Sequence, residues 1–272
     1  MYFNFVCYLA LITVLFVIYI RMTSQDKKKM YSISDNKISS KQIVNICTRN
    51  HESIIIDNHD GIIKMVSKIQ DDARPILFQT RNNPSFIDFK NAIKDLELCW
   101  TRNDNSNLTM GKIKYEDFLN EMQFNKTDKY IFDKNTEYNE KVKRITNFIP
   151  CPDLCFLNKD CPNVSIYSGC KNTGSKIQSH NQAINYLILG KILWIIFPNN
   201  NDNKKICDDE FIKNSLSINW LFLNANQLKN KIDDLNVFIQ YTGDIVFIPK
   251  QFYHVAINLE NSHGFVYSST IL

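Results

Sequence analysis

Two histidines are the residues in this sequence whose type and placement best suit chemistry. His180 and His254 each stand at the mouth of a predicted β-strand in the C-terminal half of the chain. Two histidines and one carboxylate form the facial triad that holds Fe(II) with open coordination positions. No Asp or Glu stands two residues from His180, where such a triad would place it. The residues therefore leave two interpretations open, a metal site and a pair of hydrogen-bonded structural histidines.

The strands that would position these histidines follow Pro150. Short apolar runs alternate with turn residues, a pattern typical of a β-sandwich or β-barrel. Gly243-Asp244 predicts a turn, and Pro249 ends the strand after it because proline cannot donate to a ladder. His263 falls in a predicted Ser-Gly turn. The predicted strands are Val164–Tyr167, Ala183–Leu189, Ile192–Phe197, Val237–Gln240, Ile245–Ile248 and His254–Leu259.

A shorter α/β segment precedes the β-rich half. Arg74–Phe78 predicts a strand, and Ser85 is a candidate N-cap for a helix whose apolar stripe includes Phe86, Phe89 and Ile93. The same reasoning predicts further helices at Tyr115–Met122 and Tyr138–Phe148, and a strand at Tyr130–Phe132. We therefore expect a mainly β domain with an α/β entry and flanking N-terminal helices.

The N-terminus predicts a membrane anchor. Met1–Ile20 contains no charged side chain, and roughly 20 apolar residues cross a bilayer core. No small-residue cleavage site follows, so residues 1–21 are interpreted as an uncleaved single-pass anchor. Arg21 and Lys27–Lys29 come after the span, which by the positive-inside rule places the large domain in the cytosol. Residues 22–73 predict a polar linker with one short strand at Ile54–Ile56, and residues 74–272 form the predicted domain.

Composition excludes several classes of protein. The chain of 272 residues is 44% hydrophobic with a formal charge of +4, which is ordinary for a globular protein and unlike a disordered tail. No concentrated Lys/Arg face appears, so no nucleic-acid partner is expected. Eight cysteines are compatible with disulfides in an oxidising compartment and with thiols in a reducing one.

The order of residues in the C-terminal motif resembles the signature of a known family. Residues 243–259 run Gly-Asp, four apolar residues, Pro249, and then Phe-Tyr-His and Asn-Leu. This order is similar to the signature of JmjC-domain and cupin-like (cupin-8 type) oxygenases. Residues 185–198, with Gly190 and Trp194, are similar to the strand pair of the same family, and residues 74–78 and 115–119 to its N-terminal strand and helix. His180 stands ten residues before Gly190, a spacing that resembles the JmjC-only subgroup of the endoplasmic-reticulum lumen.

The resemblance implies a double-stranded β-helix, the jelly roll of cupin and JmjC domains, with Fe(II) and 2-oxoglutarate in the barrel mouth. It implies Gln178, His180 and His254 as the metal-binding positions, and it places the domain on the lumenal side. Gln178 stands where the family carries its first histidine, and His180 stands where the family carries Asp or Glu.

A second departure from the family lies at the position that binds the co-substrate. The family's lysine position holds Ile192, and the neighbouring Lys191 is one residue out of register.

Three functional hypotheses follow from the resemblance. The first is a membrane-anchored JmjC/cupin-like domain that is catalytically degenerate and binds or scaffolds a polypeptide partner. The second is an active Fe(II)/2-oxoglutarate-dependent protein hydroxylase with an atypical metal site, formed by His180 and His254 with Gln178 or an external anion. In this hypothesis Lys191 and Trp194 contact the co-substrate. The third is a cupin-fold small-ligand binder that holds a trapped metal.

Overall fold

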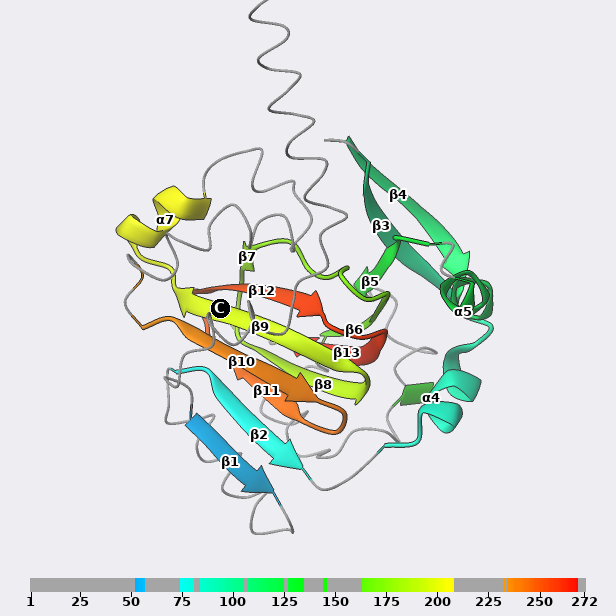
Figure 1. Cartoon of the computed structure of the whole chain (residues 1–272), viewed down its shortest axis with the longest axis horizontal. Helices are drawn as coiled ribbons and strands as arrows, with labels where there is room; N and C mark the ends of the chain where they lie inside the picture. Colours follow the sequence, from blue (N-terminus) through cyan, green and yellow to red (C-terminus); the bar gives the residue numbers. More distant parts are fainter. Residues whose placement is uncertain are drawn as a thin grey trace, which may run out of the picture. The chain divides into compact units, whose positions relative to one another are not determined.

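Two β-sheets make up most of the described chain in the computed structural model (Figure 1). The structure describes residues 52–56, 74–80, 84–104, 107–124, 127–134, 144–145, 163–207, 232 and 234–268, all within one compact unit that runs from Lys41 to Leu272. The elements are β1 (Glu52–Ile56), β2 (Ile76–Thr80), α4 (Phe86–Ile93), β3 (Glu97–Asp104), β4 (Asn107–Lys114), α5 (Tyr115–Gln123), β5 (Tyr130–Lys134), β6 (Asn163–Gly169), β7 (Gln178–Ser179), β8 (Ala183–Leu189), β9 (Lys191–Pro198), α7 (Asn201–Cys207), β10 (Asn236–Tyr241), β11 (Ile245–Ile248), β12 (Phe252–Asn258) and β13 (Ser262–Ser268).

The strands pair almost entirely in antiparallel fashion. The larger sheet has the order β1-β2-β11-β8-β13-β6-β5-β3-β4, and the smaller sheet has the order β10-β9-β12-β7. The one parallel pair among the described strands joins β1, from the predicted linker, to β2. The prediction of a mainly β domain is confirmed, and the sheets are compatible with a β-sandwich or jelly roll.

The larger sheet is covered on both faces at β11 and β8, which explains why these two strands are apolar at nearly every position. Along β8, Ile184, Tyr186 and Ile188 belong to one core cluster, together with residues of α4 and α5. Ala183 and Leu187, on the opposite face, belong to a second cluster, which also includes residues of β9, β10 and β12. The second cluster therefore lies between the two sheets.

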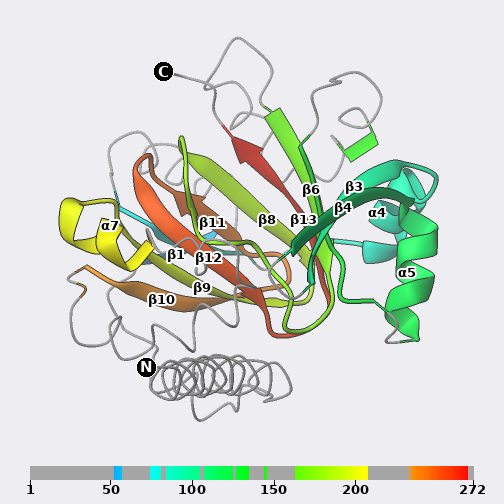
Figure 2. The ribbon, with the colours of Figure 1, turned by 90° about the horizontal axis from the view of Figure 1, so that it is seen from above.

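The two helices at the entry form as their sequence patterns predict. The Ser85 side chain accepts a hydrogen bond of 3.2 Å from the backbone N–H of Asp88 and so caps α4. The buried side of α4 carries Phe89 and Ile93, and that of α5 carries Tyr115, Phe118 and Met122. Both helices lie at the end of the domain opposite α7 (Figure 1 and Figure 2). Most of the third predicted helix, at Tyr138–Phe148, lies outside the described residues.

The six strands predicted in the C-terminal half are all present, but the prediction for His263 is wrong. His263 lies in β13, which pairs with β6 on one side and β8 on the other, and not in a turn. The glycine after it reflects close packing in the sheet. A Cβ atom on Gly264 would lie 2.2 Å from the backbone oxygen of Tyr186, so no larger residue fits there without movement.

The predicted membrane segment, residues 1–21, lies outside the described residues. Among the described helices, none is long and apolar enough to cross a membrane.

Candidate functional site

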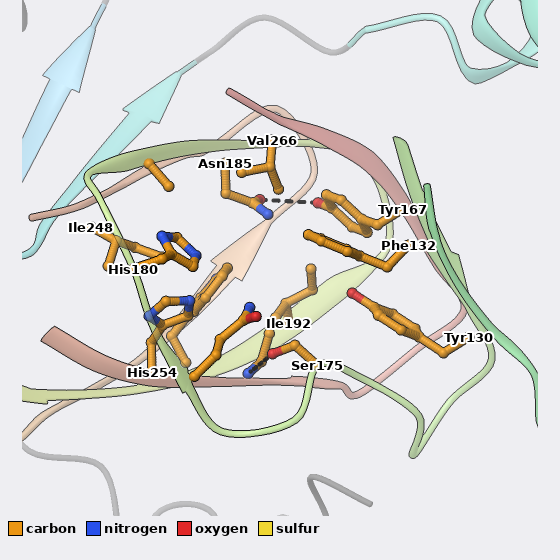
Figure 3. Close-up of a pocket in the computed structure, with 14 residues that line it drawn as sticks. Tyr130, Phe132, Tyr167, Ser175, His180, Asn185, Ile192, Ile248, His254 and Val266 are labelled. Carbon is orange, nitrogen blue, oxygen red and sulfur yellow. Dashed lines mark hydrogen bonds between the residues drawn. The ribbon is translucent and has the colours of Figure 1, made fainter. Parts of the chain in front are cut away.

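A pocket opens between the two sheets (Figure 3). The empty space in the pocket and at its open mouth amounts to about 390 Å³. None of the described side chains that line it belongs to Asp, Glu, Lys or Arg. The lining residues are Tyr130, Phe132, Tyr167, Ser175, Gln178, His180, Ala183, Asn185, Ile192, Trp194, Ile248, His254, Ala256 and Val266.

The structure brings His180 and His254 together in this pocket. Their ring centroids are 4.6 Å apart and the rings are nearly perpendicular, at 78° (Figure 3). Nδ1 of His254 lies 3.3 Å from the backbone oxygen of Phe252, and Nδ1 of His180 contacts the backbone oxygen of Asn181. Because a carbonyl oxygen only accepts, each Nδ1 carries the proton, and Nε2 is the nitrogen with the lone pair.

Burial keeps His254 neutral. The side chain is 2% exposed, and this desolvation lowers its pKa to about 3. The charge that His180 carries when protonated lowers the pKa further, whereas the hydrogen bond to the Phe252 carbonyl raises it. At neutral pH the imidazole of His254 is therefore an acceptor through Nε2 and not a cation.

Gln178 is the cross-strand neighbour of His254. The two residues face each other where β7 pairs with β12, so their side chains lie on the same face of the smaller sheet. Both line the pocket, as does His180, which follows β7 directly. The three positions implied for metal binding thus meet in one place.

Lys191 is not brought to this pocket. Its ammonium lies 3.0 Å from a carboxylate oxygen of Glu260 and 5.4 Å from the centre of the Tyr241 ring. Ile192, the next residue on β9, lines the pocket and is 1% exposed. Side chains alternate across a strand, so the one-residue offset places the cation on the other face.

Trp194 lines the pocket with its ring, 6.2 Å from the ring of His254. Its indole N–H donates to the side-chain oxygen of Gln240 at 2.8 Å, and Gln240 in turn donates to the backbone oxygen of Asp244 at 2.8 Å. A buried network therefore fixes the tryptophan, whose ring forms part of the pocket wall. Its indole N–H is bonded to Gln240 and is not available to a ligand.

Asn185 and Tyr130 are pocket residues that our sequence analysis did not identify. Asn185 is 3% exposed, and its side-chain oxygen accepts from the Tyr167 hydroxyl at 3.0 Å. One signal was present in the sequence, because Asn185 is the single amide inside the apolar run Ala183–Leu189. Tyr130 gave no comparable signal, since an aromatic residue in a predicted strand is ordinary.

The donor set does not fit the Fe(II) and 2-oxoglutarate that the family resemblance implies. Gln178, His180 and His254 supply two imidazoles and one amide, without the anionic ligand of a facial triad. In the described part of the chain, no group of three or more His, Cys, Asp or Glu side chains could hold a metal ion. No lining residue supplies a positive charge for the co-substrate carboxylates.

No protein-family model and no curated protein sequence matches the chain.

Proposed function

We propose that this chain is a membrane-anchored, JmjC/cupin-like protein whose double-stranded β-helix binds a ligand or a polypeptide partner without 2-oxoglutarate-dependent catalysis. The observation that carries the proposal is the neutral pocket, in which a histidine pair is present but no charged side chain among the described residues lines the walls.

The chemistry of catalysis argues for this choice. An Fe(II) oxygenase of this family needs an anionic ligand that strengthens iron binding and a cation that pairs with the distal carboxylate of 2-oxoglutarate. His180 occupies the position of the acid, and the apolar Ile192 occupies that of the lysine. Burying a dianion against Ile192 would remove its water without supplying a partner charge, at a cost of several kcal/mol.

One observation favours the alternative, an active Fe(II)/2-oxoglutarate-dependent hydroxylase with an atypical site. The two histidines stand close together, and in both rings a backbone carbonyl orients the imidazole through Nδ1. Backbone carbonyls commonly orient metal-binding histidines in this way. The same contacts also satisfy a structural histidine pair, so this arrangement does not replace the missing carboxylate.

Turnover of 2-oxoglutarate separates the two candidates. The full-length chain, supplied with Fe(II), ascorbate and 2-oxoglutarate under air, is expected to produce no more succinate than a reaction without protein. Ile192→Ala is the matched variant, because it opens the co-substrate position without changing either histidine. Succinate production that His254→Ala abolishes would establish the oxygenase instead.

The membrane anchor at residues 1–21 belongs to the same proposal. Its orientation decides the compartment, which is lumenal by family resemblance and cytosolic by the charge rule. Treatment of the expressed chain with an N-glycosidase distinguishes the two, because a mobility shift occurs only for a lumenal domain that carries glycans. Modification of the domain's thiols by a reagent confined to the cytosol would instead indicate a cytosolic domain.

A further inference from the structure

The pocket contains two polar groups that the fold leaves unsatisfied. The side-chain nitrogen of Asn185 has no hydrogen-bond partner among the described residues, although the side chain is 3% exposed. Figure 3 shows this nitrogen directed into the pocket, away from the oxygen that holds Tyr167. An amide N–H that faces a largely apolar pocket without a partner in the protein is available to a bound group, so a ligand that accepts from it will be bound preferentially.

Tyr130 presents the second unsatisfied group. Its side chain is 8% exposed and stacks on Phe132 with ring centroids 6.4 Å apart, and its hydroxyl has no partner among the described residues. In Figure 3 the hydroxyl points into the pocket. Asn185 and Tyr130 therefore supply hydrogen-bond donors from the walls formed by β8 and β5.

The opposite side of the pocket supplies acceptors. Nδ1 of His254 donates to the Phe252 carbonyl, so Nε2 presents its lone pair to the pocket. The amide of Gln178, which lies across from His254, also lines this side, has no side-chain partner in the described part of the chain, and supplies an acceptor oxygen as well as an NH₂ donor. The Asn185 donor thus faces the Nε2 acceptor of His254 across the pocket, and most of the remaining lining residues are apolar or aromatic.

We propose that this pocket binds a small, uncharged carboxamide group, whose carbonyl oxygen accepts from Asn185 and from the Tyr130 hydroxyl and whose NH₂ donates to Nε2 of His254. A carboxamide combines an acceptor with two donors and carries no charge, which suits a pocket whose described walls are neutral. A carboxylate would face the lone pair of His254, and an amidinium would face the N–H of Asn185. This inference rests on the proposed binding function and specifies its ligand.

Three isosteric probes test the inference on the full-length chain, namely acetamide, acetate and acetamidinium. The readout is the indole ¹H–¹⁵N resonance of Trp194, because its ring lines the pocket and its N–H is held by Gln240. The chain has three tryptophans, and Trp194→Phe assigns the signal. Acetamide is expected to shift this resonance saturably, with a dissociation constant of about 1 mM, as suits a ligand of few atoms.

Variants locate the site. Asn185→Leu and Tyr130→Phe each remove one donor and are expected to weaken acetamide binding by about tenfold and severalfold, respectively. Tyr241→Phe is the control, because Tyr241 is 49% exposed and does not line the pocket. Tyr130→Phe removes a hydroxyl that bonds to no described residue, so it keeps the test valid if Asn185→Leu fails to fold.

The outcomes separate this inference from the proposed function. The carboxamide inference is overturned if acetate or acetamidinium binds as tightly as acetamide, or if acetamide causes no saturable shift. Either result leaves the non-catalytic proposal standing. Succinate production from 2-oxoglutarate would overturn the proposed function, whichever probe binds.

Discussion

Single residues decide whether this fold can carry out the chemistry of the family it resembles. Strand alternation depends only on register, so the one-residue offset noted in the sequence is enough to separate Ile192, which lines the pocket, from Lys191, which lies against Glu260 and away from the co-substrate position assigned to it in the hydroxylase hypothesis. It could not predict that Asn185 would bond Tyr167, since that contact joins strands distant in the chain. His263 was assigned to a turn because Ser262 and Gly264, two residue types common in turns, flank it, and it proved to be a buried strand residue.

The environment of His263 gives a prediction for pH dependence. Its Nδ1 lies 2.8 Å from the Tyr115 hydroxyl and 2.6 Å from that of Ser168, and burial lowers its pKa from 6.5 to about 3. The unfolded imidazole gains a proton below its ordinary pKa while the native one does not. The free energy of unfolding therefore falls with decreasing pH, by up to about 1.4 kcal/mol per pH unit for this group.

Urea unfolding measured from pH 7 down to about pH 5, above most carboxyl titration, tests this expectation. The variant His263→Gln is expected to show a shallower decrease than the unmodified chain, although it is less stable at pH 7. Equal slopes in the two proteins would show that His263 is not a source of acid sensitivity.

At the scale of elements, local signals predicted the strands and their turns well. The bounds of β8 and β11 agree with the predicted runs, because turn residues at Gly190 and Gly243 limit them. The hairpin of β3 and β4 was missed, since its strands are rich in polar residues and carry no clear alternation. The pairing of β13 between β6 and β8 is a long-range contact that no local pattern could specify.

Gly264 in β13 provides a prediction about packing. A Cβ atom there would meet the Tyr186 backbone oxygen and the Tyr167 hydroxyl, which lies 2.4 Å from its ideal position. Gly264→Ala is therefore expected to destabilise the chain by about 1–3 kcal/mol, as overpacking of a core usually does. It should also displace Tyr167 from Asn185.

Urea unfolding gives the change in stability, and the Trp194 indole resonance reports on the pocket. If the variant is as stable as the parent and its Trp194 signal is unchanged, the strands around Gly264 accommodate the added Cβ atom without loss of stability.

At the scale of the whole molecule, the chain combines a predicted anchor, a predicted linker and a β-rich region. The mainly β class is confirmed by the sheets, whereas residues 1–21 and most of 22–73 lie outside the described residues. Strand β1, inside the predicted linker, pairs with β2 and so extends the larger sheet beyond the predicted domain boundary. Its three isoleucines indicated a strand, but nothing in the sequence identified its partner.

Deletion of residues 1–21 tests the anchor. The full-length chain is expected in the membrane fraction after alkaline carbonate extraction, because a span of roughly 20 apolar residues resists removal. The chain that begins at Met22 is expected in the soluble fraction. Recovery of the full-length chain in the carbonate supernatant would contradict a membrane-spanning anchor.

We propose that the histidine pair lies in a neutral pocket that does not support iron chemistry. Metal analysis of the full-length chain, purified without chelators and dialysed against Fe(II) under anaerobic conditions, tests this claim most directly. We predict an iron content far below one atom per chain, and the same content in His254→Ala. One iron atom per chain in the parent, lost in His254→Ala, would contradict the account.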